Sequence, residues 1–359
     1  MNLRASWRGL RGTVFALALA WIAFDVLAIA YGLSPLALAS TLFSGTWGTS
    51  YGVGQVLFKA TPLVIAAVGI DVALRAGLFN VGAEGQLAVA SLAVAVVGGR
   101  LGGWPTAIAI PTALAVGAVA GGAWAWVPGV LRARAGAHEV ISTIMMNKIA
   151  ESLVGALLAS GLALEGTVRT QDVPASVALS RLDAGWAGAT TRFVHVDFRG
   201  SAASTALVIA IGLLLLVRPF YGRARVGREL ELVRMNERAC ARERVPVARR
   251  KVQGIVLSGA VVGLASSATV LGYKGYFEEG LGAGIGFAGL GVALLGRRSP
   301  LGIAFFALLF ATLQQGGLAV NALVPKESMD LLAAIVVVTL ALAEGRLRGL
   351  LTGPSAVRT

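Results

Sequence analysis

The stretch Thr61–Leu87 reads TPLVIAAVGIDVALRAGLFNVGAEGQL and changes character near its middle. Its first half is a nearly unbroken apolar run, of the kind that crosses a bilayer as a helix. Its second half, Leu74–Leu87, interleaves three glycines with Asn80, Glu84 and Gln86. Glycine permits a helix break, and polar side chains at membrane depth are expensive and are usually kept for a function. The stretch predicts a membrane helix that stops at a polar break before a second apolar helix begins.

This polar break has two interpretations. In the first it is a broken helix that lines a pathway, and its amide groups hydrogen-bond a polar solute. In the second it is a cytoplasmic turn with ordinary helix capping. The chemistry of the residues alone favours neither.

The composition places the whole chain in a membrane. Of its 359 residues, 56% are hydrophobic and 14% are charged, whereas a soluble domain carries about 25% charged residues. The net charge of +13 fits Lys and Arg retained on the cytoplasmic side of a membrane protein. Nucleic-acid binding is excluded, because no long basic surface exists outside short loops.

Several kinds of site are absent from the sequence. Cys240 is the single cysteine, and with His138 and His195 it cannot supply a structural zinc site. A Walker A loop needs a Gly-Lys dipeptide to cradle phosphates, and none occurs. We therefore expect no catalytic residue, no metal and no cofactor in this chain. If its work uses ATP, the ATPase is another subunit.

Hydropathy predicts an all-α, polytopic transmembrane bundle of about ten spans, of which the third, eighth and tenth are short enough to be broken or re-entrant. The first run is too long for the apolar part of a cleaved signal peptide and is read as a retained helix. The predicted spans are about 12–33, 55–75, 86–99, 104–128, 139–164, 203–218, 252–272, 281–296, 300–320 and 329–344.

The basic loops set the direction of these spans. Arg4, Arg8 and Arg11 place the N-terminus in the cytoplasm. With ten spans, both termini are cytoplasmic and the long loop 165–202 is external. The basic segments then all fall inside, namely Arg132 with Arg134, the loop 218–251, Arg297 with Arg298, and Arg346 with Arg348.

Five spans on each side of the external loop make the two halves inverted. We expect a single transmembrane domain over 1–359, with repeat halves at about 12–164 and 203–344. Gly85–Gly122 and Gly286–Gly317 both read as a short apolar helix, a glycine turn with a proline, and a longer helix. Inverted repeats with discontinuous helices are typical of transporters, whose pathway lies at the repeat interface.

Two further segments carry charge. Arg228–Val245, in the predicted cytoplasmic loop 219–251, has an imperfect apolar stripe and no interrupting proline or glycine. It predicts one amphipathic helix, which either anchors on anionic lipid or docks a cytoplasmic partner. Gly136–Ile149 opens the fifth span, and Lys148 can pair with Glu151 on one helix face. A structural pair within the bundle is favoured over a pathway lining there.

These segments together resemble one known family. Thr61–Leu87 contains the run Gly-Leu-Phe-Asn-x-Gly-Ala-Glu-Gly-Gln. This run resembles the signature of permease subunits of bacterial nucleoside/simple-sugar ABC importers, which are a branch of the family of ribose and branched-chain amino-acid permeases. EVISTIMMN at Glu139–Asn147 resembles a second motif of that branch. Leu232–Val245, followed by LSGAVVGL at Leu257–Leu264, resembles the cytoplasmic coupling segment of the family and the helix after it. Arg234 stands where glycine is usual, and Arg244-Val245 stands where Gly-Ile is usual.

The resemblance implies a multi-subunit importer in the bacterial plasma (inner) membrane. In such an importer, an extracytoplasmic substrate-binding protein delivers the solute, and ABC ATP-binding subunits drive its transport. Two permeases form the pore, and the resemblance implies a heterodimer of this chain and a shorter homologue. The implied pathway residues are Phe79, Asn80, Glu84, Gln86, Glu139 and Asn147. The implied coupling residues are Arg234, Met235, Asn236, Ala239 and Val245. The alternatives are a single-chain secondary transporter for a small polar solute and a membrane scaffold without transport.

Overall fold

The computed structural model describes residues 18–19, 21–182, 198, 200–335 and 338–339. The regular structure of these residues is helical, and extended backbone pairs there only at two isolated bridges, Arg169 with Glu278 and Arg181 with Ser204. Two π-helices, η1 and η2, follow α6 and α11. In chain order the elements are α2 (Pro35–Thr46), α3 (Ser50–Arg75), α4 (Ala83–Gly98), α5 (Thr106–Ala135), α6 (Glu139–Leu157), η1 (Leu158–Leu162), α8 (Ala206–Arg223), α9 (Arg225–Met235), α10 (Glu237–Arg242), α11 (Val247–Gly263), η2 (Ser267–Lys274), α12 (Ile285–Leu295) and α13 (Pro300–Ala319).

The prediction of a polytopic helical bundle is confirmed. Each of the ten predicted spans coincides with a helix in its described part, and α4 and α12 are short, with 16 and 11 residues. Six helices are long and apolar enough to cross a membrane, or seven if Trp21–Ala30 and α2, bent by 109°, form one span. The count of ten crossings therefore stays a prediction. Helix α2 was not predicted.

The described chain forms two compact units. One contains the described residues up to Val53 and from Phe310 onward, and the other is Gly54–Leu309. In the first unit, the Tyr31 and Ser328 hydroxyls are 2.8 Å apart, and the Trp47 ring N–H donates to the Thr312 hydroxyl at 3.2 Å. Its small core is apolar and consists of Phe24, Ala28, Leu38, Val320, Val324, Met329 and Leu332.

The unit Gly54–Leu309 is built around α3 and α11. The most apolar stretch of α3 is 83% buried, whereas that of α8 is 22% buried, so the outer helices α5, α6 and α8 present an apolar surface of the kind that faces lipid. Helix α11 lies against α5, where Gly259 and Gly263 face Gly117 and Gly121. A Cβ atom on Gly263 would lie 2.1 Å from the Gly117 carbonyl oxygen. This is the close backbone approach that paired GxxxG motifs permit in membranes.

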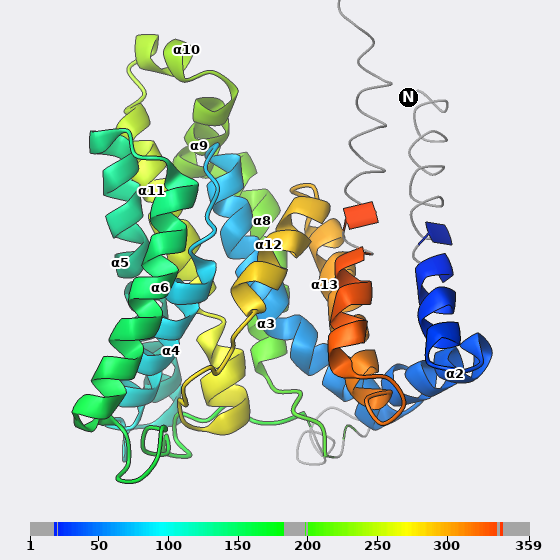
Figure 1. The fold of residues 1–359 in the computed structure, drawn as a ribbon. Coiled ribbons are helices and arrows are strands. Elements are labelled where there is room, and N and C mark those ends of the chain that lie inside the picture. Colours follow the sequence, from blue (N-terminus) through cyan, green and yellow to red (C-terminus); the bar gives the residue numbers. More distant parts are fainter. Residues whose placement is uncertain (1–17, 20, 183–197, 199, 336–337, 340–359) are drawn as a thin grey trace, which may run out of the picture. The chain divides into compact units, whose positions relative to one another are not determined.

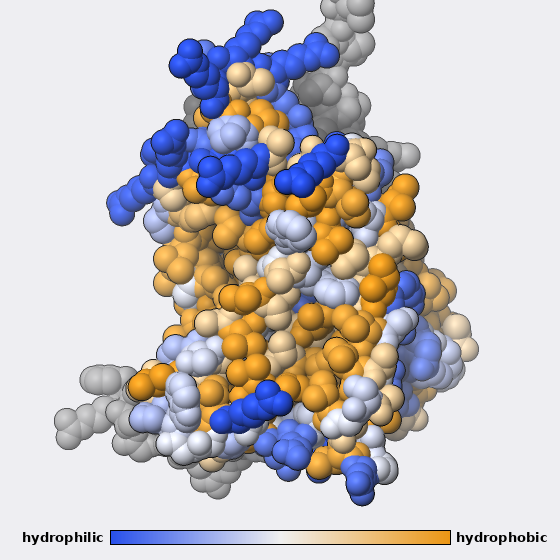
Figure 2. All heavy atoms as spheres, turned by 90° about the vertical axis from the view of Figure 1, so that its left-hand side faces the viewer, coloured by the Kyte–Doolittle hydropathy of each residue, from blue (hydrophilic) through white to orange (hydrophobic). Residues whose placement is uncertain are grey.

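One end of this unit carries the basic segments predicted to be cytoplasmic. The α5–α6 turn, the segment with α9 and α10, and the α12–α13 turn all lie at the top of the unit in Figure 1. Figure 2 shows hydrophilic residues gathered at this end, above a broad apolar belt. We call it the basic end. The described part of the loop 165–202 lies at the opposite end, as the alternation of spans predicts. Arg4, Arg8, Arg11, Arg346 and Arg348 lie outside the described residues.

Candidate functional site

The polar break after α3 is held by amide side chains. The chain leaves α3 at Arg75 and begins α4 at Ala83. Asn80 and Gln86 are 0% and 1% exposed and exchange two hydrogen bonds, of 2.9 and 3.0 Å. Asn80 Nδ2 also donates to the Ser258 hydroxyl of α11 at 2.8 Å. Because both amides are buried and paired within the protein, they fix the shape of the break.

A third amide, from α6, closes the start of α4. Asn147 Oδ1 accepts the N–H of Gly85 at 2.9 Å, and its Nδ2 donates to the Val81 carbonyl at 2.9 Å. The first of these bonds satisfies an N–H group that the first turn of a helix leaves without a partner. Gly85 is needed here, because a Cβ atom at this position would lie 3.0 Å from Asn147 Cα. The residues of the second predicted motif thus lock the first motif in place.

Glu84 joins the two halves of the chain. One oxygen of its carboxylate accepts the N–H of Gly284, and the other accepts the N–H of Gly286 at 2.8 Å. These N–H groups open α12, where the helix dipole favours a negative charge. Gly286 allows this approach, because a Cβ atom there would lie 2.4 Å from the Glu84 backbone nitrogen. Glu84, itself in the first turn of α4, therefore caps α12.

The two short helices meet at their N-termini and run apart. Figure 1 shows α4 leading from this meeting point to the end opposite the basic end, and α12 leading to the basic end. At 1.5 Å per residue, α4 and α12 are each shorter than a bilayer core of about 30 Å. Each follows a glycine-rich break and precedes a long helix near a proline, Pro105 or Pro300. This is the element order of the predicted inverted repeat, and duplication itself stays a prediction.

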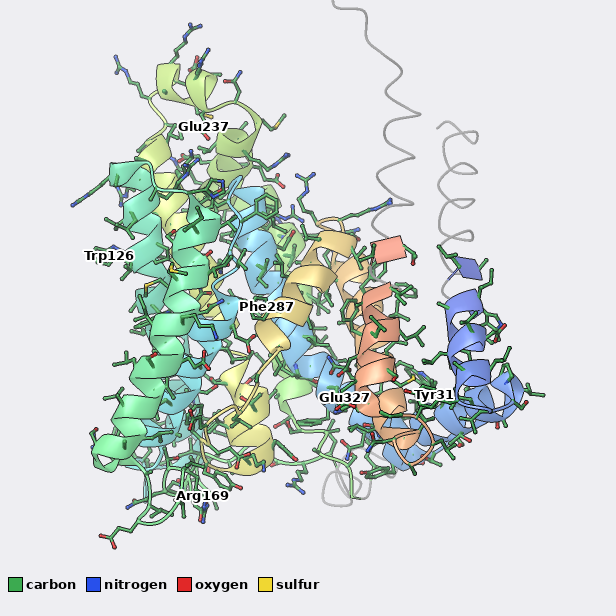
Figure 3. The ribbon with its side chains drawn as sticks, in the orientation of Figure 1. Tyr31, Trp126, Arg169, Glu237, Phe287 and Glu327 are labelled. Carbon is green, nitrogen blue, oxygen red and sulfur yellow. The ribbon has the colours of Figure 1, made fainter. Side chains whose placement is uncertain are left out.

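A cavity of about 340 Å³ lies beside this meeting point, a size typical of small-molecule sites. Glu84 and Asn147 line it, as do Glu279 from the loop after η2 and Phe287 from α12. In Figure 3 Phe287 lies on α12 beside α4 and α6. The cavity also borders Lys148 and Glu151, which pair at 2.8 Å with side chains 75% and 65% exposed. The pair forms as predicted, with its side chains exposed rather than packed within the bundle.

The six predicted pathway residues thus do not all lie together. Glu84 and Asn147 line the cavity, and Asn80 and Gln86 form the buried bonds behind it. Phe79 is 45% exposed in the loop, and Glu139 pairs with Arg132 at 3.3 Å at the basic end. Their part in transport stays a prediction. The sequence analysis did not single out Glu279 or Phe287, and it included Ser258 only within Leu257–Leu264, without connecting it to Asn80.

Glu84→Ala is expected to lower the free energy of unfolding by about 1–2 kcal/mol, because it removes both the cap and the charge from the start of α12. Glu279→Ala is the matched control. Glu279 is exposed on the same cavity wall, so its loss should change stability by less than about 0.5 kcal/mol. Thermal unfolding of the two purified variants measures both. Equal effects would contradict the capping role of Glu84.

The predicted amphipathic helix over Arg228–Val245 is wrong in one respect, because it is two helices. Helix α9 ends at Met235, and Asn236 adopts extended backbone with φ −159°. The Asn236 side chain then accepts the N–H of Ala239 at 3.0 Å and caps the short helix α10. Asparagine competes with helical backbone bonds in this way and favours helix starts over helix interiors.

Ion pairs fasten α9, the first helix of this segment, to α3 and α11. Arg75, at the end of α3, donates to Glu231 at 2.7 Å. Glu229 accepts from Arg225 at 2.6 Å and from Arg250 of α11. These hydrogen bonds, that from Arg225 first, hold the pKa of Glu229 below its ordinary value. The α9–α10 segment is therefore attached at its base to α3 and α11.

The outer surface of α9 and α10 is exposed. Arg234, Met235, Asn236 and Ala239 are exposed, and Val245 is half-buried. The Met235 side chain is 71% exposed, which is high for a large apolar residue on a charged segment. Figure 3 shows Glu237 at the tip of the basic end. An apolar anchor on a projecting, basic segment is the arrangement expected of a protein-docking element.

Broken helices that meet between two halves of a helical bundle, beside a small cavity, define a multi-pass membrane transport protein. The comparison with protein families agrees. The model for the permease component of branched-chain amino acid transport systems matches residues 52–341, and the chain belongs to this family.

Curated relatives cover most of the chain. The guanosine ABC transporter permease protein NupP of Bacillus subtilis is 31% identical over 91% of this chain and 92% of its own length. The nucleoside ABC transporter permease protein NupB of Lactococcus lactis is 27% identical over 90% of this chain and 88% of its own. The glucose ABC transporter permease protein TsgB13 of Haloferax volcanii is 29% identical over 88% and 83%.

Proposed function

We propose that this permease subunit moves nucleosides, or related simple sugars, inward across the bacterial plasma membrane as part of an ABC importer. The observation that carries the proposal is the Glu84 carboxylate, which joins the starts of α4 and α12 beside a cavity of about 340 Å³. The names of the relatives support the solute class, since they refer to guanosine, nucleosides and glucose. All of these are neutral molecules rich in hydroxyl groups.

In this proposal, the solute moves along the cavity beside Glu84 and Asn147. Glu84 and Asn147 border it, and Asn80 and Gln86 keep the break in shape behind them. Phe79 and Glu139 lie toward the basic end and act where the solute leaves. The meeting of two broken helices leaves polar groups at mid-depth in an otherwise apolar bundle, where a polar solute needs hydrogen-bond partners.

The proposed partners follow from two features of the chain, the missing Walker A loop and the exposed segment with α9 and α10. Without a Gly-Lys dipeptide it has no Walker A loop, so ATP is bound and hydrolysed by separate ABC ATP-binding subunits. These dock on the segment that contains α9 and α10 and ends at Val245, through Arg234, Met235, Asn236, Ala239 and Val245. The basic end then faces the cytoplasm, with both termini on that side. A second permease, in a heterodimer, completes the pore, and an extracytoplasmic binding protein delivers the solute.

Uptake measurements test the proposal. Cells that lack this gene and their parent strain are given labelled nucleosides, ribose or leucine, with and without depletion of ATP. Loss of ATP-dependent nucleoside uptake, restored by the intact gene, is the expected result. Loss of ribose or leucine uptake alone would keep the importer and overturn the solute. Uptake that depends on the gene but resists ATP depletion would overturn the importer in favour of a single-chain secondary transporter.

A further inference from the structure

A second cavity, of about 300 Å³, lies at the basic end and away from the proposed pathway. It opens between the end of α8 and the start of α13. Three arginines line it, Arg75, Arg218 and Arg298, and no acidic residue does. Its other lining residues are Val217, Tyr221, Ser299 and Pro300.

The charges of these arginines are not equally available. Arg75 is neutralised, because it bonds Asp71 and Glu231 at 2.7 Å each, and it also donates to the Arg298 carbonyl. Arg218 and Arg298 are exposed, and no described carboxylate forms an ion pair with either, although the charge of Arg298 also attracts the Asp71 carboxylate. Arg75 thus holds the backbone of Arg298 in place, while two guanidinium groups stay free to bind an anion.

Two further features of the cavity favour an oxyanion. The N-terminus of the 20-residue helix α13 opens at Ser299 and Pro300, and helix starts attract negative charge. Tyr221 stacks under the Arg75 guanidinium at 4.2 Å, and its buried hydroxyl has no hydrogen-bond partner among the described residues. An oxyanion in the cavity would supply the acceptor that this hydroxyl lacks.

The surroundings identify the source of the oxyanion. Leu215, three residues before the lining residue Arg218 on α8, and Leu301, which follows the lining residue Pro300 on α13, are 72% and 76% exposed. Such side chains border acyl chains in a bilayer, and basic pockets between helices on the cytoplasmic side suit anionic lipid headgroups. We infer that this cavity binds the phosphate group of an anionic phospholipid, between Arg218 and Arg298, with the lipid tails along α8.

The inference is tested on the purified, delipidated full chain. Phosphatidylglycerol, phosphatidylcholine or inorganic phosphate is titrated in neutral detergent, and bound lipid is counted by native mass spectrometry. Arg218→Gln combined with Arg298→Gln should weaken phosphatidylglycerol binding roughly thirtyfold, the factor for two basic side chains at about 1 kcal/mol each. Both side chains are exposed, so the variant should unfold at the same temperature as the parent chain without lipid.

Arg249→Gln is the matched control, because Arg249 is an exposed arginine on α11 that does not line the cavity. It should change binding by less than about threefold. Equal weakening by the control would overturn the inference in favour of a diffuse attraction between basic residues and lipid. Unchanged binding in the double variant would also overturn it. Saturation by inorganic phosphate, with no preference for phosphatidylglycerol, would keep the phosphate site and assign it to free phosphate.

Discussion

Gly263→Ala should strongly destabilise the folded protein, although it adds a single methyl group. A Cβ atom at Gly263 would lie 2.1 Å from the Gly117 carbonyl oxygen and 2.9 Å from its carbonyl carbon. Both atoms are backbone, so no side chain can turn away, and α5 and α11 must separate along their length. We expect a loss of at least about 3 kcal/mol, the upper range for overpacking in a core.

The matched control is Gly212→Ala on α8, where no atom lies within 4 Å of the added Cβ. Alanine is the better helix former, so this variant should be unchanged or more stable by up to about 1 kcal/mol. Yield of monodisperse protein and its unfolding temperature measure both variants. Stabilities within about 1 kcal/mol of each other would contradict the close α5–α11 contact, since a clash this short cannot be absorbed.

The fold was largely predictable because membrane helices are long apolar runs, which hydropathy detects in the sequence. Helix α13, predicted at 300–320, is Pro300–Ala319. Helix α2 was missed because its 12 residues are too few for a span. The two GxxxG motifs, at Gly117–Gly121 and Gly259–Gly263, are visible in the sequence, and they were overlooked because glycine is common throughout this chain.

The candidate site was predictable in its residues and not in its contacts. Hydropathy marks Glu84 and Asn147 as polar groups in apolar surroundings. Their partners are distant along the chain, because Glu84 bonds residues 200 and 202 positions away and Asn147 bonds Gly85 across 62. Only the packing of α4, α6 and α12 brings these groups together. The break at Asn236 had a local signal, since asparagine before Glu237 is typical of a helix start.

Met235→Asp should uncouple the permease from its ATPase without unfolding it. Met235 ends α9 and is 71% exposed, so a polar substitution leaves no cavity and changes stability by less than about 0.5 kcal/mol. In the proposed docked complex the same side chain is buried against an ATP-binding subunit. An unpaired charge buried there costs about 2 kcal/mol or more, which corresponds to at least about a thirtyfold loss of affinity.

Ala248→Asp is the control for this prediction, because it adds the same charge at an exposed position at the start of α11, still at the basic end. An acid in a first helical turn is favourable, so this variant should fold and keep its partner. Copurification of the ATP-binding subunit and ATP-dependent nucleoside uptake are measured for both. We expect both copurification and uptake to be lost in Met235→Asp and kept in Ala248→Asp. If Met235→Asp copurified its ATPase as well as Ala248→Asp does, the ATPase would have to dock elsewhere, and the exposed face of α9 and α10 would be left to bind lipid.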